Sequence, residues 1–406
     1  MERYDVIIAG ASFGGLAVAT QLKGKVLLIE PHSIGETQTS ACGTLLDVPK
    51  CLGLMGAVLQ VQNEIAVHTP SWTQVLDVSR SPFCTFDYPQ FCQGMVAAAR
   101  AQILHARVLG CEGNRVVTNK GRFEGDILVD ASGWRRVLGN SVQPCRGSRR
   151  SMSFGIETTT PRGGEKLCFW FDPVEVPKGV AWFFPIDRGS RVGVGAYTGK
   201  TRLGPDLQEF LDDLTLSRED EIHGGYFPSA LGEPTMGNLF LVGDAAGQCL
   251  PLTGEGIRPA IYFGLMCGAI IQEVLEGKRS LPEGLSRYRE TVLSHRKLYW
   301  YLQLCQRLLI ILPRGLASQF LLRICREPLL SLVMRAYIGF TDFERIPSSV
   351  PKAAPESAQA FSPTREEEEE WVSCGAKVAH EGPAESWKSK SQHSIERSSR
   401  NEHLDY

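Results

Sequence analysis

The sequence of 406 residues lacks several features that would assign it to a class at once. Its formal net charge is only −2, so it has no basic field that would favour nucleic acid as a partner. Its 12 cysteines include no CxxC pair and no tight grouping with histidine, so we expect no metal site. No uninterrupted apolar run approaches the roughly 18–20 residues that span a bilayer. We find no internal repeat.

No secretory signal precedes the first apolar segment, which begins almost at Met1. With scattered cysteines, this favours a cytoplasmic protein with reduced thiols. The composition is otherwise that of a globular protein, with 43% hydrophobic and 22% charged residues. The length allows two or three packed units. From Pro351 onward the sequence becomes rich in Ser, Pro, Glu and Lys, which predicts a disordered tail over 351–406.

The N-terminal segment has the pattern of a β-α-β unit. Residues 5–10 form a short apolar strand, 16–22 suit a helix, and 25–30 form a second apolar strand. Such a unit implies a parallel pair with a right-handed crossover. Residues 126–130 and 238–243 are two further candidates for buried strands. We therefore predict an α/β protein with a Rossmann-type dinucleotide-binding domain.

The middle of the chain has a different pattern. Residues 151–230 contain four runs typical of antiparallel strands, whereas the chain after Gly254 favours helices. We predict an inserted antiparallel β-sheet domain (α+β) for the substrate and a C-terminal helical region. The expected boundaries are 1–150 and 231–285 for the two parts of the Rossmann-type domain, 151–230 for the inserted domain, 286–350 for the C-terminal helices and 351–406 for the tail.

A small-residue loop follows the first strand and opens the helix. Gly10 permits a tight turn, and small side chains at Ala11 and Ser12 let backbone amides approach a pyrophosphate at the helix N-terminus. Glu30 ends the second strand, where a carboxylate accepts hydrogen bonds from an adenosine ribose. The predicted dinucleotide-binding residues here are Gly10, Ala11, Ser12, Phe13, Gly14, Gly15 and Glu30.

A second motif favours FAD over NAD. The apolar strand 238–243 ends in Gly243-Asp244, and a carboxylate at this place can hold the ribityl hydroxyls of a flavin. The turn 251–257 then leads into a long helix, whose N-terminus can stabilise negative charge on a reduced flavin. We add Gly243, Asp244, Gly254, Gly256 and Ile257 to the predicted cofactor-binding residues.

These motifs resemble the FAD-dependent oxidoreductases related to aromatic hydroxylases, and within them the geranylgeranyl reductase family. The segment 177–185, with Trp182 and Phe184, is similar to that family's Pro-x-x-Tyr-x-Trp-x-Phe-Pro motif, although Val180 replaces the tyrosine. The resemblance covers about residues 1–340. Two departures from the family pattern are present: Ser132 replaces the usual Asp of an Asp-Gly pair, which weakens direct nicotinamide binding, and Asp87-Tyr-Pro-Gln precedes a helix where an arginine is usual.

The resemblance implies that the segment 40–44 lies beside the flavin. Cys42 and Gly43 are then cofactor-binding, and Cys42 is the candidate acid that protonates an alkene carbon; alternatively it is a small residue that fits against the flavin. Cys249 is a rival. Trp182 and Phe184 alternate with Phe183 along a strand, so one face can line an apolar substrate site; a plain sheet core is the alternative.

We predict an FAD-dependent oxidoreductase that saturates carbon–carbon double bonds of a polyprenyl (geranylgeranyl-type) lipid, quinone tail or pigment. Its electrons would come from NAD(P)H or a reduced electron-carrier protein. The alternatives are an FAD-dependent monooxygenase or halogenase acting on a small aromatic substrate, and a silent flavoprotein. Apolar residues and arginines alternate over 287–340. Three interpretations are open: the region lies on an anionic membrane surface, it caps the substrate site, or it packs on the body.

Overall fold

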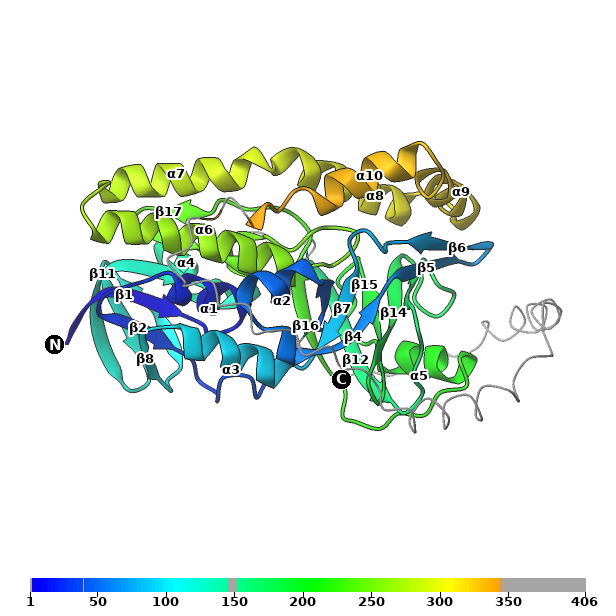
Figure 1. Cartoon of the computed structure of the whole chain (residues 1–406), viewed down its shortest axis with the longest axis horizontal. Helices are drawn as coiled ribbons and strands as arrows, with labels where there is room; N and C mark the ends of the chain where they lie inside the picture. Colours follow the sequence, from blue (N-terminus) through cyan, green and yellow to red (C-terminus); the bar gives the residue numbers. More distant parts are fainter. Residues whose placement is uncertain (1, 39, 145–151, 344–345, 347–406) are drawn as a thin grey trace, which may run out of the picture. The chain divides into compact units, whose positions relative to one another are not determined.

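The computed structural model describes residues 2–38, 40–144, 152–343 and 346. Met1–Lys352 forms one compact unit, drawn with its secondary structure in Figure 1. The predicted tail over 351–406 lies outside the described residues.

A mainly parallel sheet confirms the α/β prediction. Its strand order is β17-β18-β11-β1-β2-β8, with β10 and β9 added beside β11. Neighbours from β18 to β8 are parallel, and β17, β10 and β9 pair antiparallel. The strands are β1 (Arg3–Ala9), β2 (Val26–Ile29), β8 (Ala101–Leu104), β9 (Val108–Glu112), β10 (Arg115–Thr118), β11 (Gly121–Asp130), β17 (Thr235–Met236) and β18 (Leu239–Leu241).

Helices α1 (Phe13–Thr20) and α6 (Ile257–Leu275) pack closely together. A Cβ atom at Gly264 would lie 2.7 Å from the backbone oxygen of Gly14, and one at Gly268 2.6 Å from that of Val18. Helix α6 is long and apolar enough to cross a membrane, which the search for uninterrupted apolar runs missed. Because 78% of its apolar window is buried inside the protein, its composition fits a core helix.

The second sheet has the order β16-β12-β15-β14-β13-β5-β6. Its strands are β5 (Glu64–Thr69), β6 (Trp72–Asp77), β12 (Met152–Thr160), β13 (Leu167–Phe171), β14 (Gly179–Ile186), β15 (Gly189–Ala196) and β16 (His223–Pro228). The expected division at residue 150 is therefore too simple, since β5 and β6 come from the first part of the chain. The sheet is also not wholly antiparallel, because β13 and β5 pair in parallel.

A third, small sheet has the order β3-β7-β4. It contains β3 (Gly43–Leu45), β4 (Val58–Gln62) and β7 (Phe83–Phe86). Short helices α2 (Asp47–Leu52), η1 (Met55–Ala57) and α3 (Tyr88–Ala98) accompany it, and η2 (Gly133–Arg135) and α4 (Val137–Val142) follow β11.

Strand alternation gives the second sheet two different faces. Ala181 and Phe183 pack with α5 (Gly204–Asp213) in a separate apolar cluster. Val180, Trp182 and Phe184 instead point into the main core, which they share with Cys42. The predicted alternation of Trp182 and Phe184 against Phe183 is thus what the structure shows.

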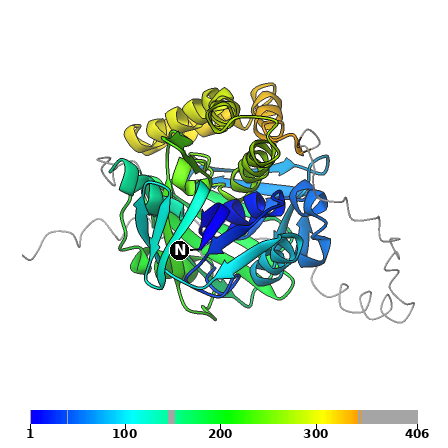
Figure 2. The ribbon, with the colours of Figure 1, turned by 90° about the vertical axis from the view of Figure 1, so that its left-hand side faces the viewer.

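Four C-terminal helices form a layer beside α6, seen at the top of Figures 1 and 2. They are α7 (Leu281–Ser294), α8 (Arg296–Ile311), α9 (Arg314–Ile324) and α10 (Leu329–Ile338). Buried tyrosines attach them to the sheet and to the loop beyond it: Tyr288 donates to the backbone oxygen of Leu241 (2.9 Å), and Tyr299 to that of Gln248 (2.6 Å).

Candidate functional site

The loop after β1 has the backbone of a phosphate-binding turn. Gly10 has a φ of +101°, and a side chain there would clash with the backbone oxygen of Ala131. A side chain at Gly15 would overlap the backbone oxygen of Gly10. Glycine is therefore required at both positions, one for the turn and one for the close contact of helix with loop.

Glu30 is positioned against this loop. Its Oε2 accepts a hydrogen bond from the backbone amide of Ala11 at 2.9 Å, so it fixes the loop beside β2. Ser12 is exposed at the N-terminus of α1, and Phe13 instead buries its ring against Phe86, Tyr88 and Phe91. The side chain of Phe13 therefore supports the loop from the core, and only its backbone remains for a ligand.

Gly243 and Asp244 lie at the end of β18, in the 3₁₀ turn η4 (Gly243–Ala246). Burial raises the pKa of Asp244 to about 6. Within the described part of the chain its carboxylate receives no side-chain or backbone hydrogen bond. A partly buried carboxylate without a donor fits the hydroxyls of a bound ligand.

The turn 251–257 brings the second motif to the same place. A Cβ atom at Gly256 would lie 3.8 Å from Oδ1 of Asp244, so the two motifs are adjacent. Gly254 has a φ of +67° and lies against the ring of Phe227 on β16. Tyr197 donates to the backbone oxygen of Leu252 at 2.6 Å, which fixes the turn to the second sheet. Ile257 begins α6 directly after the turn.

Cys42 precedes β3 and is fully buried, with a φ of +52°. Its Sγ donates to the backbone oxygen of Ser40 at 3.2 Å. Burial raises the pKa of Cys42 well above its usual range; the Arg191 guanidinium opposes this shift and the Glu157 carboxylate adds to it. Cys42 is therefore a neutral thiol at neutral pH, which excludes a thiolate nucleophile, and its raised pKa makes it a weaker acid than a free thiol.

Gly43 and Phe184 meet although they are far apart in sequence. A Cβ atom at Gly43 would lie 2.8 Å from Cε2 of Phe184. The rival Cys249 is also buried, and burial raises its pKa well above its usual range. Its Sγ is 3.6 Å from the Cβ position of Gly256, so it belongs to the neighbourhood of Asp244 rather than to that of Cys42.

The indole of Trp182 lies across a strip of glycines on neighbouring strands. Cβ positions at Gly155 and Gly195 come within 3.3 and 3.5 Å of the indole, and one at Gly193 would overlap it. The indole Nε1 donates to Oε2 of Glu157 at 2.8 Å. The ring is thus held flat against the sheet by both packing and a charge-assisted hydrogen bond.

Glu157 and His223 are polar residues at this site that the sequence analysis missed. Glu157 is buried, and its Oε1 contacts Nε2 of His223 (3.0 Å) and Nε2 of Gln38 (3.3 Å). No local pattern marked it, because Glu157 shares its face of β12 with Ser153, Gly155 and Thr159 and so does not interrupt an apolar run. A buried carboxylate with three donors fixes Trp182 and His223 relative to each other.

Replacing Gly193 by valine should displace the Trp182 indole from the sheet. The new side chain occupies the volume of the ring, and the Glu157 hydrogen bond then breaks. We expect a shifted tryptophan fluorescence spectrum and a loss on the order of 2–4 kcal/mol in unfolding free energy. The matched control is Gly225→Val on β16, where no heavy atom lies within 4 Å of the Cβ position. Equal spectra and stabilities for the two variants would contradict this account of Trp182.

Ser132 and Asp87, the two departures from the family pattern, both have local roles. Ser132 Oγ donates to Oδ1 of Asp130 at 2.6 Å and accepts from the backbone amide of Val137 at 2.8 Å. Asp87 caps α3, accepting from the backbone amide of Gln90 at 2.7 Å. Ser132 therefore closes the turn after β11.

No protein-family model matches the chain. Curated relatives do: the digeranylgeranylglycerophospholipid reductase of Methanococcus vannielii is 32% identical over 128 residues, which are 30% of this chain and 33% of that protein. The chloroplastic geranylgeranyl diphosphate reductase of rice is 33% identical over 134 residues, 30% of this chain and 28% of that protein. The chain thus matches about a third of the length of these relatives.

Solved structures share the fold over most of the chain. A geranylgeranyl bacteriochlorophyll reductase-like protein of Thermoplasma acidophilum superposes with a TM-score of 0.74, at 19% identity, over 86% of this chain and 98% of that one. The flavin-dependent brominase Bmp2 gives a TM-score of 0.64 at 16% identity, over 85% and 96% of the two chains. The resemblance that the motifs predict is therefore confirmed: the chain is related to the geranylgeranyl reductases and has the fold that such proteins share with flavin-dependent halogenases.

Proposed function

We propose that the protein is an FAD-dependent reductase that saturates carbon–carbon double bonds of a polyprenyl lipid. The observation that carries this proposal is the adjacency of the Asp244 turn to the aromatic face of the second sheet. Phe227 lies against Gly254 on one side and against Gly155, beneath Trp182, on the other. A ligand held at Asp244 therefore has an apolar aromatic surface within reach.

The described residues fit FAD. Glycines at Gly10 and Gly15 let the loop turn and pack directly against α1, so backbone amides at the N-terminus of α1 are available to a pyrophosphate, and Asp244 is a partly buried carboxylate that lacks a donor among the described residues. FAD would supply a hydride to one alkene carbon. Cys42 would then supply the proton for the other carbon from its Sγ, and Trp182, Phe184 and Phe169 would exclude water from the prenyl chain.

The electron donor and the location belong to the proposal. The Ser132 hydroxyl already donates to Asp130 and accepts from the backbone amide of Val137, so it does not replace the carboxylate that serves nicotinamide binding. This favours a reduced electron-carrier protein over direct use of NAD(P)H. We propose a cytoplasmic protein that works at the surface of the membrane that holds its lipid.

The second candidate is an FAD-dependent monooxygenase or halogenase, favoured by the structural similarity to Bmp2. A single anaerobic turnover separates the two. The purified flavoprotein is reduced chemically, a geranylgeranyl lipid is added, and the flavin spectrum and product mass are followed. Reoxidation with a gain of two hydrogens supports the reductase. A flavin that stays reduced until oxygen enters supports the monooxygenase.

Replacing Cys42 by serine should slow this reoxidation by about 10²–10⁴-fold, because a general acid contributes that much. FAD content should remain stoichiometric, since serine preserves the size of the buried side chain. Cys92→Ser, a second buried thiol in the same core, is the matched control and should keep the wild-type rate. A Cys42→Ser rate equal to that of the control would assign the proton to another group.

A further inference from the structure

Helix α8 exposes a stripe of apolar side chains that one arginine interrupts. Trp300, Leu304, Arg307 and Ile311 recur at intervals of four, three and four residues, which places them on one helical face. Their neighbour Tyr301 is 59% exposed, and Trp300 and Ile311 are 56% and 74% exposed. A monomeric protein rarely exposes apolar side chains of this size in a row, so the stripe indicates a surface that is covered by something else.

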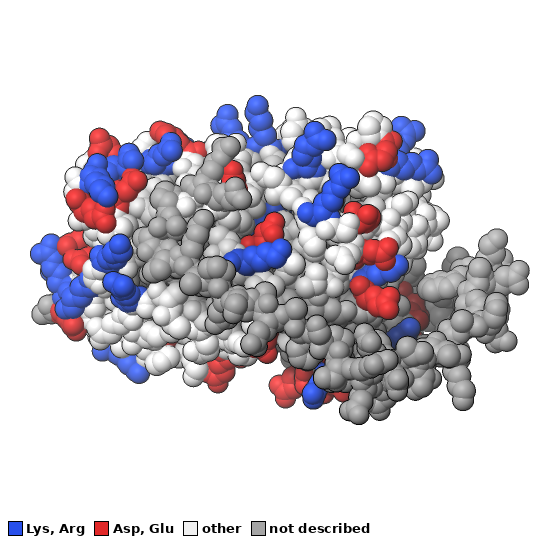
Figure 3. Space-filling model, in the orientation of Figure 1, with Lys and Arg blue, Asp and Glu red and all other residues white. Residues whose placement is uncertain are grey.

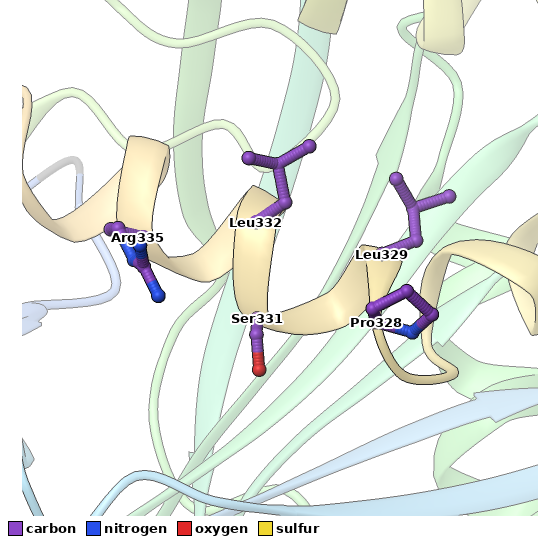
Figure 4. A pocket seen from close by; sticks show the side chains of 5 residues that line it. All are labelled: Pro328, Leu329, Ser331, Leu332 and Arg335. Carbon is purple, nitrogen blue, oxygen red and sulfur yellow. The ribbon is translucent and has the colours of Figure 1, made fainter.

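Exposed leucines also lie on the next two helices. Leu316 on α9 is 59% exposed, and Leu329 and Leu332 on α10 are 40% and 63% exposed. Around α10 lies a shallow pocket of about 440 Å³, lined by Pro328, Leu329, Ser331, Leu332 and Arg335. Figure 4 shows Leu329 and Leu332 pointing to the same side of the helix. We call the exposed residues of α8, α9 and α10 the apolar–basic face.

The charged residues of this region are mostly basic. Residues 296–338 contain seven Lys or Arg and one acidic residue, Glu327, in a chain whose net charge is −2. Arg314 pairs with Asp172. Among the described residues, Arg307, Arg323, Arg326 and Arg335 form no ion pair. Figure 3 shows Lys and Arg along the edge where these helices lie, with uncharged surface between them.

We propose that the apolar–basic face docks on an anionic lipid bilayer. Trp and Tyr suit the boundary between headgroups and acyl chains, leucines enter the acyl layer, and unpaired arginines bind lipid phosphates. The excess of basic residues over 296–338 complements the negative charge of anionic lipid headgroups, and this complementarity favours a bilayer as the occupant. The inference is linked to the proposed function, since a prenyl lipid resides in a bilayer, but the exposed residues carry it independently.

Vesicle binding tests the proposal without measuring turnover. The full-length flavoprotein is sedimented with vesicles of phosphatidylcholine, alone or with a minority of phosphatidylglycerol. We expect binding to the anionic vesicles that weakens with salt. The triple variant Trp300→Ser, Leu304→Ser, Ile311→Ser should lower the partition coefficient at least about tenfold, and so should Arg307→Gln with Arg335→Gln.

The matched control is Leu109→Ser with Arg100→Gln, which removes an equally exposed leucine (58%) and an exposed arginine elsewhere on the surface. It should bind vesicles like the wild type. FAD content and the circular dichroism spectrum show that each variant is folded. Binding that is equal on neutral vesicles, or unchanged in the triple variant, overturns the proposal. The proposal is also overturned if the wild type forms a dimer, does not bind vesicles, and loses the dimer in the triple variant. The apolar–basic face would then contact a second copy of the chain.

Discussion

Replacing Arg258 by alanine should lower the unfolding free energy by about 3–5 kcal/mol, the usual cost of leaving a buried charge without its partner. The Arg258 side chain is fully buried at the start of α6. Its Nε and Nη2 each donate to a carboxylate oxygen of Glu255 at 2.7 Å. Glu255 lies between Gly254 and Gly256, so the ion pair is part of the turn proposed to hold the flavin.

The same guanidinium connects that turn to the C-terminal helices. Its Nη1 donates to the backbone oxygen of Tyr337 (2.9 Å) and to that of Ile338 (3.2 Å) at the end of α10. The rings of Tyr337 and Phe340 lie against it, with centroids 4.7 and 4.5 Å away. Tyr337 also donates its hydroxyl to Glu255. Loss of Arg258 should therefore loosen α10 and the flavin turn together.

The measurement is urea unfolding combined with an FAD titration of each variant. Arg258→Ala should be destabilised and should bind FAD at least about tenfold more weakly, a loss of 1.4 kcal/mol. Arg279→Ala is the matched control, because it removes a partly exposed pair with Glu273 at 2.8 Å and should cost under about 1 kcal/mol. If Arg258→Ala is no less stable than Arg279→Ala, the buried pair does not join the turn to α10.

Local patterns predicted the local parts of this fold. The β-α-β unit and the start of a long helix after the turn 251–257 follow from apolar and glycine patterns within one stretch of sequence. The addition of β5 and β6 to the second sheet does not, because pairing between β5 and β13 joins segments about a hundred residues apart. Strand alternation shows which face a residue takes, but it does not show which distant strand lies beside it.

The same limit applies to the site. The turn glycines Gly10 and Gly15 could be placed from sequence because backbone geometry there admits only glycine, whereas the role of Asp244 as a flavin ligand stays a prediction. Glu157, His223 and Gln38 come from three separate segments, and only the folded chain brings them to Trp182. Arg258 did leave a signal, since it is the one charged residue in α6 before Glu273. A single charge in an apolar helix indicates a buried partner, and that partner, Glu255, is three residues away.

Replacing Asp244 by asparagine should have opposite effects on flavin binding and on the stability of the flavin-free protein. Asparagine lacks the charge that strengthens hydrogen bonds from ribityl hydroxyls, and such bonds contribute about 1.5–3 kcal/mol. FAD affinity should therefore fall about 10- to 100-fold. In the flavin-free protein, burial raises the pKa of Asp244 from 3.8 to about 6, so ionising this carboxylate costs folding free energy.

The raised pKa of Asp244 determines how the stability of the flavin-free protein changes with pH. Below about pH 4 the carboxyl is protonated in both folded and unfolded chains, and wild type and Asp244→Asn should be equally stable. As the pH rises from about 4 to about 6, the unfolded chain has lost the proton that the folded chain still holds, so the wild type loses stability; above about pH 6 both are ionised and the loss is complete. The variant should then be more stable than the wild type at pH 8, by at most about 3 kcal/mol. Solvent screening at the partly exposed Asp244 reduces this difference.

Urea unfolding of the flavin-free proteins at pH 4 and pH 8, with an FAD titration at pH 8, measures both effects. Asp126→Asn is the control, because it removes an exposed carboxylate that pairs with Arg3 and should leave FAD affinity unchanged. A variant that binds FAD like the wild type would remove Asp244 from the flavin site. If Asp244→Asn is more stable than the wild type only without flavin, the ionised Asp244 carboxylate costs folding free energy in the empty site. The ligand hydroxyls that donate to this carboxylate then offset that cost when flavin binds.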